Sequence, residues 1–265
     1  MQNTKASPIS EKPERRMQME KSVAIILAAG QGKRMQSNEK KQYMTLRGKQ
    51  ILTYSLEVFE KSFVDQIVIV VNKGEEEYVM QNIVLPGGFT KVSAIVPGGK
   101  ERYHSVAAGL EVAHMLPEGE ELAFCFIHDS ARPFVTEEIL ERALDDVRKY
   151  NACVVGMPVK DTIKIMDVDG FVESTPNRDY TWAVQTPQVF DFDLALQCYR
   201  QLLKEEKNLL DHEIKITDDA MVIENFSHTQ VYLTEGSYDN IKITTPEDLY
   251  LAERILDRRE EMKQN

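Results

Sequence analysis

Four basic side chains follow two glycines in the segment 26–44, "ILAAGQGKRMQSNEKKQYM". Backbone N–H groups can approach an anion closely at residues such as Gly30 and Gly32, and lysine and arginine neutralise its charge. The whole chain carries a formal net charge of −11, so a local group of cations predicts a small-anion site rather than a generally basic surface. A solvated surface run is the alternative interpretation. The four cations are Lys33, Arg34, Lys40 and Lys41.

Two common phosphate-binding loops do not fit this segment. A P-loop would continue with Ser or Thr after its Gly-Lys pair, whereas this chain has an arginine there. The dinucleotide fingerprint would need a small residue at Met35, and the residues after the next expected strand, Asn72-Lys73, include no acid that could hold the ribose of NAD. Glycines and cations after a first strand then suit a triphosphate, because ligands of parallel sheets bind at the carboxyl ends of the strands.

The elements that must position these residues follow a repeated pattern. Short runs rich in Val, Ile and Ala alternate with longer segments whose apolar residues recur at helical spacing, as in βα units. We expect strands near 23–28, 66–71, 92–96, 122–127, 152–157 and 229–233. We expect helices near 51–62, 75–83, 101–115, 137–149, 192–206 and 246–262. Together they predict a doubly wound α/β fold with a mostly parallel sheet.

One segment breaks this rhythm. Residues 162–175, "TIKIMDVDGFVEST", alternate polar and apolar side chains around Asp169-Gly170, a common hairpin turn. We predict a protruding β-hairpin arm there. A two-stranded ribbon is marginal in water on its own, and a second subunit would cover it.

The composition limits the class of protein. Asp and Glu number 43 against 32 Lys and Arg, which argues against nucleic acid or an anionic membrane as a partner. Residues 1–21 are polar and lack the apolar run of a signal peptide, so we expect a flexible tail before a single domain over 22–262. No apolar run approaches the ~20 residues that span a bilayer. Cys125, Cys153 and Cys198 are far apart in sequence and are typical of reduced core residues in a cytoplasmic protein.

Further motifs follow in order along the chain. They are "PGGKERYHSV", "HDSARPFV", "VKDTIK", "WAVQTPQVF", "ITDDA" and "NIKITTPEDL". With "LAAGQGKRM" and "KQYM", they resemble the 2-C-methyl-D-erythritol 4-phosphate cytidylyltransferases of the non-mevalonate isoprenoid pathway, from about Ser22 to Leu256. The resemblance implies a Rossmann-like nucleotidyltransferase fold. It also implies an enzyme that uses Mg²⁺, transfers CMP from CTP to methylerythritol phosphate and releases pyrophosphate.

The resemblance also assigns roles to individual residues. Arg34 and Lys41 match the pair that stabilises the charge of the transition state. No side-chain base is needed, because the attacking phosphate oxygen is already anionic at neutral pH. The positions that match contacts to the acceptor substrate are Arg178, Lys242, Thr162, Thr186, Asp129 and Ser130. The positions that match the CTP pocket are Ala28, Ala29, Gly30, Gly32, Gly99, Lys100 and Ser105.

Several polar residues keep more than one interpretation. Asp129 can cap a helix, pair with Arg132, or contact substrate or, through water, Mg²⁺ that is mainly held by the CTP phosphates. Asp218 and Asp219 favour a helix start over a metal pair. His128 is expected to be a packed, hydrogen-bonded side chain rather than an acid or base.

The chain departs from the family pattern at Lys100 and Asn177, where acidic residues are common. A ribitol 5-phosphate cytidylyltransferase is the nearest alternative function, and a nucleotide-sensing module without turnover is an alternative of another class. In the resembling family, two arms clasp each other, and Thr and Arg beside the arm reach the neighbour's site. We therefore predict a homodimer in which Thr162 and Arg178 complete the partner's site.

Overall fold

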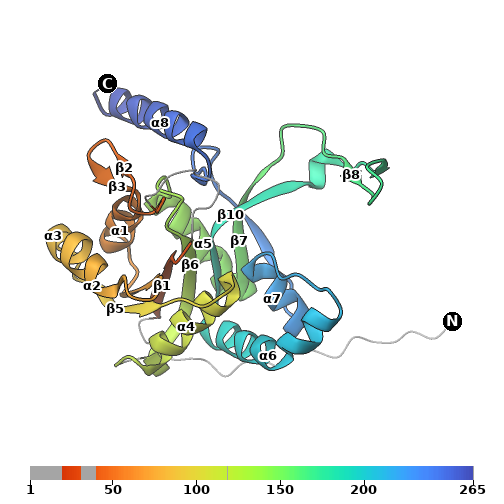
Figure 1. Ribbon diagram of the computed structural model, residues 1–265, viewed down its shortest axis with the longest axis horizontal. Coiled ribbons are helices and arrows are strands. Elements are labelled where there is room, and N and C mark those ends of the chain that lie inside the picture. The colour runs from red at the N-terminus through yellow and green to blue at the C-terminus, as the bar shows by residue number, and fades with distance from the viewer. Residues whose placement is uncertain (1–19, 31–39, 118, 265) are drawn as a thin grey trace.

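A seven-stranded sheet forms the centre of the computed structural model, which describes residues 20–30, 40–117 and 119–264 (Figure 1). Neighbouring strands are parallel, with one exception: the strand of residues 182–191, β10, runs antiparallel to both of its neighbours. Across the sheet the strands are β11 (Tyr232–Glu235), β7 (Ala152–Pro158), β10 (Trp182–Asp191), β6 (Leu122–Asp129), β1 (Lys21–Ala28), β4 (Gln66–Val71) and β5 (Val92–Pro97).

Helices cover both faces of this sheet. The helices are α1 (Ile51–Lys61), α2 (Glu76–Val79), α3 (Leu85–Gly87), α4 (Arg102–Met115), α5 (Glu137–Tyr150), α6 (Phe192–Asp211), α7 (Asp219–Phe226) and α8 (Pro246–Gln264). Side chains of α1, α2 and α5 pack with Ala24 and Ile26 of β1, whereas those of α4, α6 and α7 pack with Val23 and Ile25. All four of these strand residues are fully buried, which explains their continuous apolar run. The predicted fold class is confirmed.

The helix α5 shows how local sequence sets one element. Its buried residues, Ile139, Leu140, Ala143 and Val147, recur at three- and four-residue spacing and form one face. Acidic residues occupy its first turn and basic residues its last turn, which suits the helix dipole. Asn151 then adopts φ 63° and donates its N–H to the carbonyl of Val147 at 2.8 Å, ending the helix in a left-handed cap.

Several boundaries differ from the sequence-based expectation. The central strand β10 was not predicted, because it contains Pro187 and the polar residues Gln185, Thr186 and Gln188. These three polar side chains are nevertheless buried and hydrogen-bonded. The last strand spans 232–235 rather than 229–233. Where one helix is expected at 75–83, the chain forms three consecutive helical pieces: α2, a π-helical turn over Met80–Val84, and then α3.

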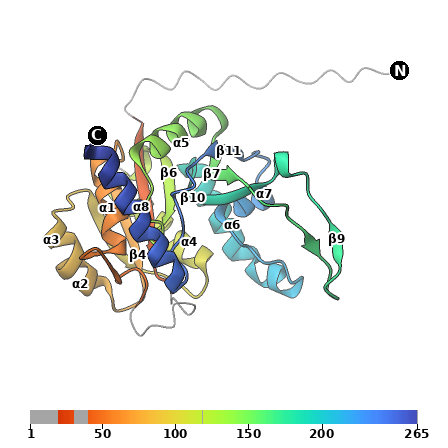
Figure 2. The same ribbon diagram turned by 90° about the horizontal axis from the view of Figure 1, so that it is seen from above.

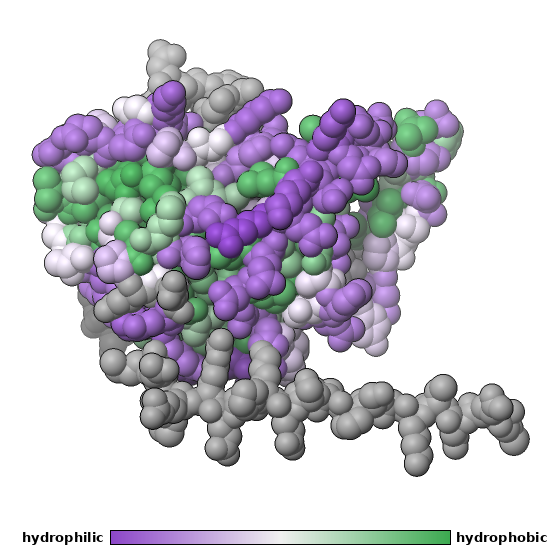
Figure 3. Space-filling model, turned by 90° about the horizontal axis from the view of Figure 1, so that it is seen from below, coloured by the Kyte–Doolittle hydropathy of each residue, from purple (hydrophilic) through white to green (hydrophobic). Residues whose placement is uncertain are grey.

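The predicted hairpin at 162–175 is present as two short strands, β8 (Ile165–Met166) and β9 (Val172–Ser174). Asp167 Oδ1 accepts the N–H groups of Asp169 and Phe171, and Gly170 closes the turn at φ 90°. Figures 1 and 2 both show this arm projecting from the sheet. Figure 3 shows apolar side chains exposed on it, and Phe171 is 73% exposed.

A smaller hairpin, β2 (Thr45–Leu46) and β3 (Lys49–Gln50), leads into α1 and contacts the C-terminal helix α8. Arg47 in its turn forms ion pairs with Asp257 and Glu260 of α8. Among the described residues, no helix has the length and apolarity needed to cross a bilayer.

Candidate active site

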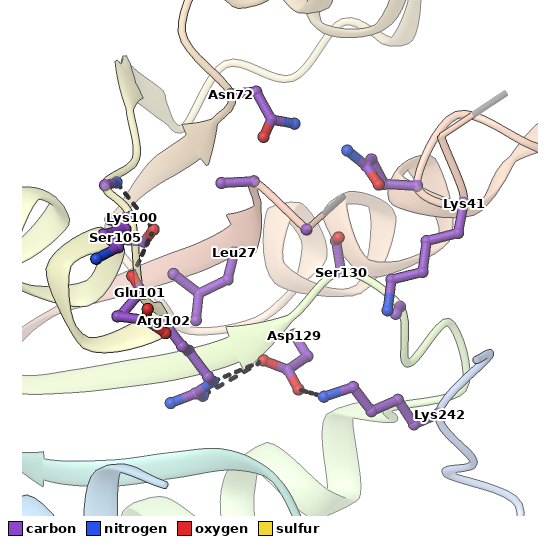
Figure 4. Close-up of a pocket in the computed structure, with 15 residues that line it drawn as sticks. Leu27, Lys41, Asn72, Lys100, Glu101, Arg102, Ser105, Asp129, Ser130 and Lys242 are labelled. Atoms are coloured by element: carbon purple, nitrogen blue, oxygen red, sulfur yellow. Dashed lines mark hydrogen bonds and ion pairs between the residues drawn. The ribbon is translucent and has the colours of Figure 1, made fainter. Parts of the chain in front are cut away.

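A pocket of about 560 Å³ lies where β1, β4 and β6 end and where the loop after β5 enters α4 (Figure 4). This volume lies within the range of small-molecule sites, and its position is the one at which parallel sheets bind ligands. The residues lining it are Leu27, Ala29, Gly30, Lys41, Gln42, Asn72, Gly99, Lys100, Glu101, Arg102, Ser105, Asp129, Ser130, Ala131 and Lys242.

Small residues bring two backbone segments close together on one side of this pocket. A Cβ atom at Gly98 would lie 2.8 Å from the Cβ of Ala29 and 2.6 Å from Ser105 Oγ, so a side chain there would push the segments apart. Ser105 Oγ accepts the N–H of Gly99 at 3.2 Å. The loop 97–101 is thereby fixed against the first turn of α4.

A chain of alternating charges crosses the base of the pocket. Asp129, at the end of β6, accepts a hydrogen bond from Lys242 Nζ at 2.6 Å through Oδ2. Its Oδ1 lies 3.3 Å from two nitrogens of Arg102, the first residue of α4. Arg102 also donates to Asp219, with Nη2 to Oδ2 at 2.8 Å, and Asp219 accepts from Tyr199 as well. Three segments that are distant in sequence meet at the Asp129 carboxylate.

These contacts fix the charge states of the chain. Burial alone would raise the pKa of Asp129, but Arg102 and Lys242 hold it well below its ordinary range. The pKa of Arg102 is well above its ordinary value despite burial, because Asp219 and Asp129 stabilise the cation. Asp129 is therefore an anion shared by two cations.

His128 is packed beneath the pocket rather than facing it, as the sequence predicts. It is fully buried, and burial lowers the pKa of its imidazole to about 4. Nε2 lies 3.1 Å from the carbonyl oxygen of Arg132, so it carries the proton, and Nδ1 accepts from the hydroxyl of Thr186 at 3.0 Å. That hydroxyl in turn accepts the backbone N–H of Asp129 at 3.1 Å. Neutral His128 and Thr186 thus hold the Asp129 backbone in place.

Most of the residues assigned from the sequence meet in this pocket. Lys41, Asp129, Ser130 and Lys242 line it with the nucleotide-loop residues Ala29, Gly30, Gly99, Lys100 and Ser105. Ala28 lies just behind as the last residue of β1. Arg34 and Gly32 lie outside the described residues. Lys40 does not line the pocket and instead pairs with Glu75.

Three assigned residues lie elsewhere. Thr162 and Arg178 are exposed at the base of the arm and do not line the pocket of their own chain. Arg178 donates to the carbonyl of Lys160 at 3.4 Å. Thr186 is buried behind Asp129 and touches it through the backbone contact already described.

The geometry bears on two sets of alternatives that the sequence left open. The Asp129 carboxylate contacts Arg102 and Lys242, whereas the guanidinium of Arg132 donates to the carbonyls of Asn240 and Val184. Asp218 caps α7 by accepting the N–H of Met221 at 3.1 Å, as expected. Asp219 is the first residue of that helix, also as expected, and its carboxylate is in addition the buried partner of Arg102.

Arg102, Gln42 and Asn72 also line the pocket, although their sequence motifs predict no role for them. Arg102 lies inside a quoted motif, three residues after Gly99 of the β5 loop, and a cation at the first position of a helix is disfavoured by the dipole. That unfavourable placement was a signal that the arginine has specific acidic partners.

The fold and this pocket together define a nucleotidyltransferase of the Rossmann-like class. A sequence profile of one family, 2-C-methyl-D-erythritol 4-phosphate cytidylyltransferase, matches residues 22–258. The chain belongs to that family, which confirms the resemblance found in the motifs.

Individual relatives agree with this assignment. A 2-C-methyl-D-erythritol 4-phosphate cytidylyltransferase of Clostridium kluyveri (strain NBRC 12016) is 47% identical over 238 residues, covering 89% of this chain and 97% of that protein. The protein of the same name from Lachnoclostridium phytofermentans is 44% identical over 90% of this chain and 97% of its own. The crystal structure of 4-diphosphocytidyl-2C-methyl-D-erythritol synthase from Anaerococcus prevotii superposes with a TM-score of 0.75 at 33% identity, covering 90% and 96% of the two chains.

We predict that His128 makes the fold sensitive to acid. Its folded-state pKa of about 4 lies below the unfolded value, so the unfolded chain binds the proton first and stability falls as pH drops from about 6.5 toward 4. Between pH 7 and pH 5, urea unfolding should show that the wild type loses about 2 kcal/mol more than His128→Gln. Equal losses in the two proteins would contradict a neutral buried imidazole.

We also predict strong coupling between Arg102 and Asp219. Asp219→Asn leaves the arginine with Asp129 as its remaining acidic partner and should reduce the free energy of unfolding by about 3 kcal/mol, the lower end of the cost of breaking a buried pair. The double variant Arg102→Met/Asp219→Leu removes both charges and should be more stable than the single variant. Denaturant titrations of both variants provide the check, and a double variant that is less stable than Asp219→Asn would contradict the coupling.

Proposed function

We propose that this protein transfers CMP from CTP to 2-C-methyl-D-erythritol 4-phosphate, forming 4-diphosphocytidyl-2-C-methyl-D-erythritol and pyrophosphate. The observation that carries the proposal is one pocket in which a small-residue loop and Lys41 face the Asp129–Lys242 pair (Figure 4). The loop suits a nucleotide, and the lysines suit phosphates from two substrates. Family membership supports the same reaction.

In the proposed reaction, a phosphate oxygen of the acceptor attacks the α-phosphorus of CTP. The new P–O bond forms as the bond to the β-phosphate breaks, and pyrophosphate leaves with the electron pair. The nucleophile is already an anion, so the protein has to align two repelling anions and neutralise the charge that develops. Lys41 and Arg34 are proposed to stabilise that charge, with Lys41 acting as a compact point charge.

Lys242 is proposed to hold the acceptor phosphate. Its side chain is 36% exposed and reaches the pocket, and Asp129 keeps it in place before the substrate arrives. The hydrogen bond from Ile243 N to Ala131 O, at 2.8 Å, fixes the Lys242 segment beside the loop that follows β6. Ser130, in the same loop, is proposed to contact the acceptor substrate. The buried Thr186 is proposed to act indirectly, by orienting Asp129.

Magnesium is proposed to reach the site mainly with the phosphates of CTP. Within the described residues, no group of three or more acidic, His or Cys side chains could hold a metal ion. Asp129 and Glu101 are the carboxylates that line the pocket, and Asp129 already has a cation on each oxygen. These residues fit a metal held by phosphate oxygens and touched by Asp129 only through water. The ion would add positive charge against the transferring phosphoryl group.

The cytoplasm is the proposed compartment. Cys125, Cys153 and Cys198 are buried and carry free thiols, and burial raises the pKa of each of them. Neutral thiols inside the core suit a reducing environment.

We predict a strong preference for CTP over ATP, because the close approach of Ala29 to Gly98 leaves little room for a purine. Pyrophosphate release should be measured for the purified protein with Mg²⁺. The assay compares CTP with ATP, and methylerythritol phosphate with ribitol 5-phosphate. Release is expected with CTP and methylerythritol phosphate. Faster release with ribitol 5-phosphate would favour the other polyol acceptor, and nucleotide binding without release would favour a sensing module.

A homodimer joined through the arms is also proposed. The hairpin carries exposed apolar side chains, among them Met166, Phe171 and Val172, and a two-stranded ribbon of this kind needs cover. Thr162 and Arg178 lie at its base, away from their own pocket. A two-fold partner would receive them in its acceptor site, while Arg34, Lys41 and Lys242 act within their own subunit.

Mixing two inactive variants tests whether sites are shared. We predict that Lys41→Ala and Arg178→Ala protein, mixed and allowed to exchange, recover activity toward about a quarter of the wild-type value. Half of the dimers are then mixed, and each mixed dimer has one intact site. Subunit exchange should be verified by mass, and activity that stays at the parental level despite exchange would rule out shared sites.

A further inference from the structure

A cluster around Glu75 lies beside the pocket, and Glu75 itself is outside the segments that carry the family resemblance. The Glu75 side chain is only 15% exposed. Its Oε1 atom accepts from Lys40 Nζ, and Oε2 accepts from the hydroxyl of Tyr43 at 2.7 Å. Asn72 adds its Nδ2 at 3.0 Å and its backbone N–H at 3.3 Å to Oε2. One carboxylate therefore ties the turn 40–43 to the loop that follows β4.

The cluster is charged and well packed. Although burial opposes ionisation, the hydrogen bonds from Lys40, Tyr43 and Asn72 keep the pKa of Glu75 below its ordinary value. Burial and the neighbouring carboxylate raise the pKa of the Tyr43 phenol, so it remains a donor. The ring of Tyr78 packs edge-on against that of Tyr43, with centroids 5.1 Å apart. These contacts restrain the turn 40–43 from one side.

A second anchor restrains the same turn from the other side. Gln42 Nε2 donates to the carbonyl oxygen of Ala28 at 2.6 Å, at the end of β1. Within the turn, the N–H of Tyr43 donates to the carbonyl of Lys40 at 2.9 Å. Because β1 and β4 are adjacent and parallel, both anchors lie at the sheet edge that carries the pocket. Lys41 stands between Lys40 and Gln42, the two anchored residues.

We propose that Glu75 is a positioning residue for Lys41. By holding Lys40 and Tyr43, it fixes the turn from which Lys41 extends into the pocket (Figure 4). The inference rests on the proposed role of Lys41 in CMP transfer. Lysine has a long flexible side chain, and a displacement of about 1 Å in a group that stabilises a transition state can lower the rate by about 100-fold. A fixed backbone reduces that freedom.

Steady-state kinetics of Glu75→Ala, Lys41→Ala and the double variant test this proposal, with CTP and methylerythritol phosphate as substrates. Glu75→Ala should lower kcat by about 10-fold to 100-fold and change the KM for CTP much less. Lys41→Ala should lower kcat further. The double variant should be no slower than Lys41→Ala, because Glu75 acts only through that lysine. Glu75→Gln keeps an acceptor for Tyr43 but loses the charge that binds Lys40, so its kcat should be intermediate.

Glu60→Ala is the matched control. Glu60, on α1, accepts from Thr90 N at 2.8 Å, from Thr90 Oγ1 at 2.6 Å and from Lys91 N at 3.1 Å, so it also anchors a loop with several bonds. That loop precedes β5, at the edge of the sheet opposite the pocket, and the variant should keep the wild-type kcat.

The outcomes separate this inference from the proposed function. If the losses in the two single variants multiply in the double variant, Glu75 acts independently of Lys41 and the inference is wrong. Wild-type kcat in Glu75→Ala, or an equal loss in Glu60→Ala, also overturns it. Normal kcat in Lys41→Ala instead overturns the role proposed for that lysine, whatever the result at Glu75.

Discussion

The Asp129 carboxylate, shared by two cations, is the interaction on which the pocket depends. It joins the end of β6 to the start of α4 through Arg102 and to the segment before α8 through Lys242. A carboxylate at this depth without partners would be costly, so the chain must bring both cations to it. Asp219 continues the alternation of charge into α7, and Thr186 holds the backbone of Asp129 from behind. The ends of the sheet strands determine where the pocket lies, and these ion pairs hold the segments around it in place.

An acidic chain can still form a site for anions because electrostatic effects are local. At physiological ionic strength, exposed charges farther apart than about 8 Å are largely screened from one another. The formal charge of −11 is spread over the surface, whereas Lys41, Lys100 and Lys242 all line one pocket. Asp129, one of the two acids that line this pocket, holds the cations Arg102 and Lys242 in place. Net charge therefore says little about what such a pocket binds.

The sequence predicted the fold class and most of the pocket because both depend on local patterns. Apolar runs identify strands such as β4, and short motifs at strand ends identify residues such as Asp129 and Lys242. What it missed depends on contacts between distant segments. β10 was missed because its buried glutamines and threonine are satisfied by partners elsewhere in the chain. Arg102 and Glu75 were missed for the same reason, since only the folded chain shows which side chains they meet.

The arm is inserted between two neighbouring antiparallel strands, β7 and β10, and this has an evolutionary consequence. The ladder pairs Pro158 with Trp182, and the N–H of Val159 bonds to the carbonyl of Thr181, so the insertion is closed at its base. Residues can be gained or lost beyond that closure without shifting the register of either strand. The length of the arm can therefore change among descendants of the gene without disturbing the pairing of β10 with β6 and β7.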